Sequence, residues 1–147
     1  MSKDLHTDPA ENPKRICVIG VGRFGIALII KLSALGCDVS AWDRRETALD
    51  SVRNHVTTCI LADATDQTAM TKAALNQYDA VCVTLSHDLT PVLTAVAVLG
   101  AADLCRIHFR VTDERHLILL KRLGVEHFLD VEDRAAEVLG PLIVSGL

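Results

Sequence analysis

The sequence is poor in aromatic residues and contains no long uninterrupted hydrophobic run. It has one Trp, one Tyr and three Phe among 147 residues, although 50% of the residues are hydrophobic. The core must therefore be aliphatic, which suits a parallel sheet covered on both faces. No apolar stretch approaches the roughly 18–20 residues needed to cross a bilayer, and the amino terminus lacks a secretory signal pattern. We expect a soluble, cytoplasmic domain, which can still serve a membrane protein.

The sequence also lacks a basic excess and closely spaced cysteines. The net charge is −4 and the Lys and Arg residues are scattered, so we expect no nucleic-acid partner. The cysteines are too far apart for a CxxC metal or redox motif, and we expect buried free thiols in a reducing compartment. They are Cys17, Cys37, Cys59, Cys82 and Cys105.

Strand-like and helix-like segments alternate along the chain after a polar segment that contains two prolines. Strands are predicted over 15–20, 38–43, 56–62, 79–85, 104–111 and 126–130. Helices are predicted over 23–36, 45–54, 66–76, 88–100, 113–124 and 131–144, the last broken or kinked near Gly140 and Pro141. This alternation predicts an α/β fold, a Rossmann-like doubly wound parallel sheet of about six strands in a single domain. We expect a flexible polar tail over 1–14, a nucleotide-binding domain over 15–130 and a carboxyl-terminal helix over 131–147 that serves as a dimerisation or crossover segment.

The glycines of "GVGRFG" lie between the first predicted strand and the first predicted helix. In such a turn Gly20 permits the tight bend, Gly22 lets a phosphate approach the backbone, and Gly25 lets the helix pack closely. The motif alone is a weak signal, but its position after a strand and before a helix is the context that dinucleotide binding requires. The alternative is a glycine turn that binds no ligand.

Two acidic residues end the second and third predicted strands. Asp43 lies 18 residues after Gly25, where a carboxylate can accept both hydroxyls of an adenosine ribose and disfavours a 2′-phosphate. The neighbouring Arg44 and Arg45 argue the other way, since an arginine there can accommodate that phosphate. Asp43 can instead cap the following helix. Asp63 either accepts from the adenine amino group or caps the helix after "ADATD", and the residues alone do not decide between these roles.

Together these motifs resemble the regulator-of-potassium-conductance nucleotide domain. The resemblance rests on "VIGVGRFGIALIIKL", "AWD", "ADATD" and "RLGVEHFLDVEDRAAE", and it covers residues 15 to about 144. Such domains serve Trk/Ktr-type potassium uptake systems, Kef-type exchangers and gated potassium channels. The combination of an arginine in "GRFG" with "DAT" after the third strand is more specific than the glycines.

The resemblance implies further site residues. It places Arg23, beside Phe24, against the polyphosphate, with reach to the nucleotide of a neighbouring copy, and it places Arg110 near the phosphates. It aligns Ala64 with the "DAT" element, offers the backbone of Ser86 to the ligand, and aligns Glu132 with a glutamate that helps to hold a divalent cation at a dimer interface. The alternatives are a solvated Arg23 and, for Glu132, a solvated acidic helix start. Val131 departs from the proline often found before that glutamate.

The resemblance therefore implies a cytoplasmic regulatory subunit at the inner face of the membrane, which gates a potassium transporter or channel. The nucleotide is expected to be ATP or ADP, with NAD(H) or AMP as alternatives. A regulator needs no second substrate site, and we expect no enzymatic activity. The alternative function is an NAD-dependent oxidoreductase or a stand-alone nucleotide-binding protein.

The last predicted helix carries Ala135, Val138, Leu139, Leu142 and Ile143 at helical spacing. This face predicts a homodimer, or a higher ring assembly, whose interface includes residues 131–144. The alternative is a helix that folds back on its own sheet.

Overall fold

The computed structural model describes residues 12–85, 87–98 and 106–146. Six parallel strands form one sheet in the order β3-β2-β1-β4-β5-β6. The strands are β1 (Arg15–Ile19), β2 (Asp38–Asp43), β3 (Thr58–Leu61), β4 (Ala80–Val83), β5 (Ile107–Arg110) and β6 (His127–Leu129). The predicted Rossmann-like, doubly wound α/β sheet is confirmed.

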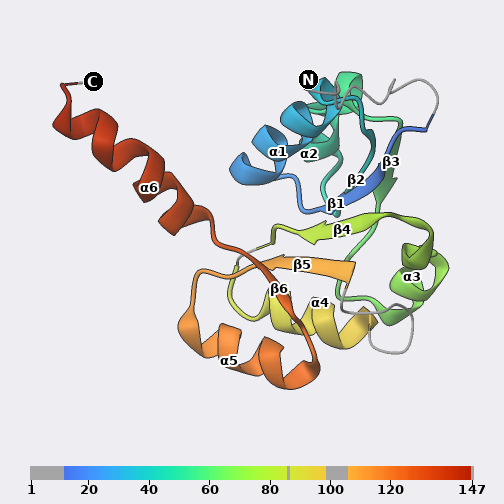
Figure 1. The fold of residues 1–147 in the computed structure, drawn as a ribbon. Coiled ribbons are helices and arrows are strands. Elements are labelled where there is room, and N and C mark those ends of the chain that lie inside the picture. Colours follow the sequence, from blue (N-terminus) through green and yellow to red (C-terminus); the bar gives the residue numbers. More distant parts are fainter. Residues whose placement is uncertain (1–11, 86, 99–105, 147) are drawn as a thin grey trace.

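Helices cover the two faces of this sheet (Figure 1). The helices α1 (Arg23–Ala34) and α2 (Glu46–Asp50) lie on one side, and α4 (Thr90–Val98) and α5 (Glu114–Leu123) lie on the other. The short α3 (Gln67–Lys72) packs against α4. Among the described residues, no helix is both long and apolar enough to cross a membrane.

The core consists of two aliphatic layers because the strand side chains alternate between the faces of the sheet. Ile16, Val18, Val39 and Ala41 pack beneath the α1 side. The opposite layer is centred on Cys17, Ile19, Val81, Ile107 and Phe109.

The cysteines in the described residues are free, as predicted, although only Cys17 and Cys82 are buried. Burial raises the pKa of the Cys82 thiol to about 11, so this thiol stays protonated at neutral pH. Cys105 lies outside the described residues, as do residues 1–11 of the predicted tail.

Two predicted helices are shorter in the structure because buried side chains redirect the chain. The segment 45–54 forms α2 and then a separate 3₁₀ turn, Arg53–His55, and the turn follows the fully buried Val52. The segment 66–76 ends its α-helix at Lys72. Ala74 then adopts a left-handed conformation, with φ of 51°, and a second 3₁₀ turn, Leu75–Gln77, buries Leu75.

The last helix, α6 (Val131–Val144), projects away from the rest of the domain (Figure 1). The predicted bounds are confirmed, but the break near Gly140 is wrong, because a single helix continues through Pro141. The alternative in which this helix folds back on its own sheet is also wrong, since α6 has no buried residue. Val138 and Ile143 are 64% and 69% exposed. The described residues leave this apolar face uncovered.

Candidate functional site

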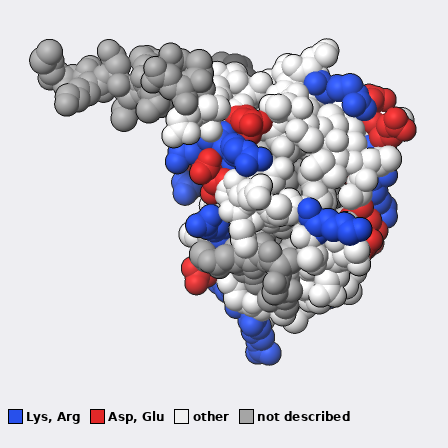
Figure 2. Space-filling view, turned by 90° about the vertical axis from the view of Figure 1, so that its right-hand side faces the viewer, with Lys and Arg blue, Asp and Glu red and all other residues white. Residues whose placement is uncertain are grey.

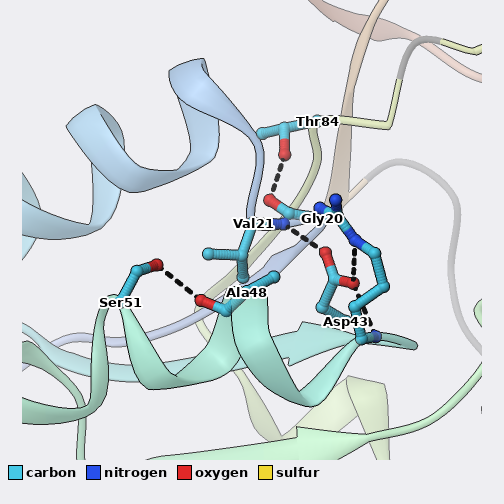
Figure 3. Close-up of polar contacts among 7 residues, drawn as sticks. Gly20, Val21, Asp43, Ala48, Ser51 and Thr84 are labelled. Atoms are coloured by element: carbon cyan, nitrogen blue, oxygen red, sulfur yellow. Dashed lines mark hydrogen bonds and ion pairs between the residues drawn. The ribbon is translucent and has the colours of Figure 1, made fainter.

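The glycine loop links the carboxyl end of β1 to α1 and is held by contacts within the chain. Gly20 has φ of 106°, a conformation that side chains other than glycine rarely adopt, and its N–H donates to the Trp42 carbonyl at 2.8 Å. A Cβ on Gly25 would lie 2.1 Å from the Gly20 carbonyl oxygen. That same oxygen accepts from the Thr84 hydroxyl at 2.6 Å, a contact drawn as a dashed line in Figure 3. Gly20 and Gly25 are therefore required by the fold.

Gly22 differs from these two glycines. It precedes α1 with φ of −91°, which any residue can adopt, and a Cβ built on it would meet no described atom within 4 Å. It is exposed, and within the described part of the chain no side chain caps the start of the helix. Packing among the described residues therefore gives no reason for a glycine here. Arg23, the first residue of α1, is also exposed.

Asp43 lies at the carboxyl end of β2, directly beside this loop (Figure 3). Its side chain is buried, and its Oδ2 accepts the Val21 N–H at 2.9 Å. Its Oδ1 accepts from Arg45 twice, from the backbone N–H at 2.8 Å and from Nε at 3.2 Å. Burial alone would raise the pKa of Asp43, but the hydrogen bonds from Val21 and Arg45 outweigh it and lower the pKa. Asp43 is therefore ionised at neutral pH.

The alternative role of Asp43 as the N-cap of α2 is wrong. The residue at the N-cap of α2 is Arg45, and no side chain makes a capping hydrogen bond there. Asp43 instead joins the glycine loop to the β2–α2 turn.

Asp63 follows β3 and is exposed to solvent. Its Oδ1 accepts from the Thr65 N–H at 2.9 Å and from the Thr65 hydroxyl at 2.7 Å, and these two bonds lower the pKa of Asp63. The proposed capping role is wrong, because Asp66 is the residue that caps α3, through the N–H groups of Thr68 and Ala69. The adenine role of Asp63 stays a prediction.

A cleft of about 420 Å³ brings these elements together. It opens at the carboxyl ends of the strands, next to β1. Strands β2 and β3 extend the sheet on one side of β1, and β4, β5 and β6 extend it on the other, so the order of the strands switches direction at β1. Open α/β sheets bind ligands at this switch point. The lining includes Gly20, Asp43, Arg44, Arg45, Asp63 and Thr65.

Arg110 ends β5 and lies over the Phe24 ring, with 5.4 Å from Cζ to the ring centroid. This contact places Arg110 next to the first turn of α1, and its role near the phosphates stays a prediction. Arg110 Nη2 also pairs with Glu132 Oε1 at 2.7 Å, and this hydrogen bond lowers the pKa of Glu132. A cation at Glu132 would have to compete with that ion pair. No group of three potential metal ligands occurs within 12–85, 87–98 and 106–146.

Two other predicted site residues are placed differently. Ala64 is 6% exposed and belongs to the buried core, so its side chain is not available to a ligand. Ser86 lies outside the described residues.

The sequence reasoning missed several residues of the cleft. Trp42, Thr65, Leu85, His87 and Leu93 line it. Thr65 had a local signal, since a hydroxyl two residues after Asp63 can bond to that carboxylate. Leu93 had none, because it reaches the cleft only through the placement of α4 against the sheet.

A family model described as the TrkA-N domain matches residues 16–130. The chain is also 26% identical over 116 residues to the Ktr system potassium uptake protein A of Vibrio alginolyticus, covering 79% of this chain and 53% of that protein. Against the Ktr system potassium uptake protein C of Bacillus subtilis it is 25% identical over 132 residues, covering 90% and 60%. The chain thus spans little more than half the length of these relatives.

Solved structures share the fold. The NAD(P)-binding domain of an exopolyphosphatase-related protein from Archaeoglobus fulgidus has a TM-score of 0.77 at 22% identity, covering 88% of this chain and 97% of that one. The TrkA-N domain of the inner membrane protein ybaL from Escherichia coli has a TM-score of 0.70 at 18% identity, covering 90% and 98%. The AMP-bound Kef CTD of Shewanella denitrificans has a TM-score of 0.62 at 23% identity, covering 91% and 82%.

Proposed function

The chain belongs to the TrkA-N domain family, and from this membership we propose that it is a regulatory domain that binds an adenine nucleotide and controls a potassium transport system. The Ktr relatives are named as potassium uptake proteins, which supports the transport role. The AMP-bound Kef structure supports the adenine nucleotide.

Gly22 is the observation that carries the nucleotide part of the proposal. An exposed glycine with an ordinary φ and free space around its missing side chain is unexplained by folding. A phosphate group that approaches the loop backbone would explain it, because a side chain there would occupy the ligand's position. The uncapped N-terminus of α1 supplies free N–H groups and a partial positive charge at the same place.

The charges around the loop favour a nucleotide with several phosphates. Arg23 begins α1, and Arg110, although paired with Glu132, lies beside the same turn. Two guanidinium groups can donate to phosphate oxygens, of which ATP and ADP carry more than AMP. NAD(H) and AMP are the competing ligands, since both carry the ribose that Asp43 would hold. A divalent cation at Glu132 would have to displace Arg110, which already pairs with that carboxylate.

We further propose that the domain binds its nucleotide without transforming it and acts in the cytoplasm on a membrane potassium transporter or channel subunit. A regulator of this kind requires only that the ligand bind two states of the assembly with different affinity.

Thermal unfolding with ATP, ADP, AMP, NAD and NADH tests the nucleotide assignment, with GTP and CTP as base controls. A ligand that binds the folded chain at 100 times its Kd should add about 2.7 kcal/mol to the free energy of unfolding. We expect the adenine nucleotides to raise Tm and the controls to do so less. Equal shifts with GTP and ATP would contradict adenine recognition, and the absence of any shift would contradict the proposal.

We also propose that α6 mediates homodimerisation. Its exposed Val138, Leu139, Leu142 and Ile143 form an apolar surface that no other part of the described chain covers, and a symmetric dimer would bury it. Leu139→Asp should yield monomers in sedimentation or light scattering, because a carboxylate would be desolvated in the interface. The variant should keep its fold, since α6 has no buried residue. Wild-type chain that stays monomeric at tens of micromolar, with and without nucleotide, would contradict the dimer.

A further inference from the structure

Arg45 occupies part of the carboxylate that the proposed ribose would use. An ionised carboxylate offers about four acceptor positions, two on each oxygen. In Asp43 the Arg45 N–H and Nε take both positions on Oδ1, while Val21 takes one position on Oδ2. Among donors from the described residues, only one position, on Oδ2, is left open.

A nucleotide with an intact ribose would present two hydroxyls to this carboxylate. One hydroxyl can donate to the open position on Oδ2. The second must replace an existing donor, and the two backbone N–H groups are fixed by the glycine loop and the β2–α2 turn. The Arg45 Nε is the donor that can leave, because its side chain is 59% exposed whereas that of Asp43 is 4% exposed.

We propose that Arg45 is a specificity-determining residue of this cleft, a side chain that competes with the second ribose hydroxyl for Asp43. This proposal rests on the proposed nucleotide function. Arg45 lowers the affinity for a ribose with two hydroxyls relative to one with a single hydroxyl. It thereby reduces the ratio of ribonucleotide affinity to deoxyribonucleotide affinity in this cleft.

Arg44 provides a matched control. It lines the same cleft and carries the same charge, but no hydrogen bond joins it to Asp43 among the described residues. Its positive charge instead adds to the two Thr65 hydrogen bonds in lowering the pKa of Asp63. Loss of either arginine removes one positive charge from the cleft, so a general weakening of phosphate binding should be shared by both variants.

The test is calorimetric titration of wild type, Arg45→Ala and Arg44→Ala with AMP, 2′-deoxy-AMP and 3′-deoxy-AMP. The readout is the ratio of the AMP affinity to each deoxy affinity, which cancels the shared charge effect. We expect Arg45→Ala to raise this ratio about two- to fivefold, the range for an exposed ion pair. Arg44→Ala should leave the ratio at the wild-type value.

Three outcomes would overturn the proposal. An unchanged or lower ratio in Arg45→Ala would show that Arg45 does not compete with the ribose. An equal rise in Arg44→Ala would assign the effect to charge alone. Wild-type chain that binds none of the ATP, ADP, AMP, NAD and NADH panel would remove the nucleotide function itself, a result distinct from binding with an unchanged ratio.

Discussion

Gly25→Ala should lose about 3 kcal/mol or more of its free energy of unfolding. The added Cβ would lie 2.1 Å from the Gly20 carbonyl oxygen and 3.0 Å from the Thr84 hydroxyl. Overpacking of a core costs typically 1–3 kcal/mol, and here the obstacle is a backbone atom with no other rotamer to adopt. Because domains of this size are only marginally stable, much of the variant should be unfolded or insoluble. Urea denaturation followed by circular dichroism measures the loss.

Gly22→Ala is the matched control for this prediction. It adds the same methyl group three residues earlier, where no described atom lies within 4 Å. We expect its free energy of unfolding to stay within about 1 kcal/mol of wild type, the range for changes at a helix N-cap. Its nucleotide affinity should fall, since the methyl group would stand in the phosphate position. Equal stability losses in the two variants would contradict the distinct roles of these glycines.

Asp43→Ala should weaken adenine nucleotide binding roughly ten- to hundredfold, or about 1.5–3 kcal/mol. The ribose hydroxyls would lose their charged acceptor. The fold should suffer as well, because the buried Val21 N–H would lose its partner, at a cost of about 1–3 kcal/mol. Calorimetry reports the first effect and urea denaturation the second. Unchanged affinity in a folded variant would remove the ribose assignment.

Asp43→Asn separates the two effects. Its amide oxygen can still accept the Val21 N–H, so stability should recover in part. Its amide nitrogen faces the Arg45 donors and cannot accept a hydroxyl proton, so nucleotide affinity should stay low.

The stability effect of Asp43→Ala should also depend on pH. The pKa of Asp43 is lowered in the folded chain, so the unfolded chain binds the proton more tightly. The stabilisation from the ionised carboxylate is therefore fully present above the unfolded value of about 3.9 and is lost as pH falls through the lower folded value. The difference between wild type and variant should be constant from pH 7 to 5 and shrink only below about pH 4.

The fold and the outline of the candidate site could be predicted from the amino-acid sequence alone. Alternation of apolar strands with helices fixes a doubly wound sheet because parallel strands need crossovers, and these are almost always right-handed. The positions of Gly20, Gly25 and Asp43 followed from local rules, since a turn, a close helix packing and a strand end each depend on neighbours in the chain. The bounds of α6 also followed from its helical spacing.

Features that depend on contacts between residues far apart in the sequence could be read only from the folded chain. The buried Val52 and Leu75 ended α2 and α3 early, because the burial of an apolar side chain outweighs the modest gain from extending a helix. The exposure of α6 was left open by a pattern that suits either a core or an interface. Only the folded chain showed that Gly22 has free space around it while Gly25 has none. The hydrogen bonds from Arg45 to Asp43 were also visible only in the folded chain, because the partners of a side chain depend on the three-dimensional arrangement around it.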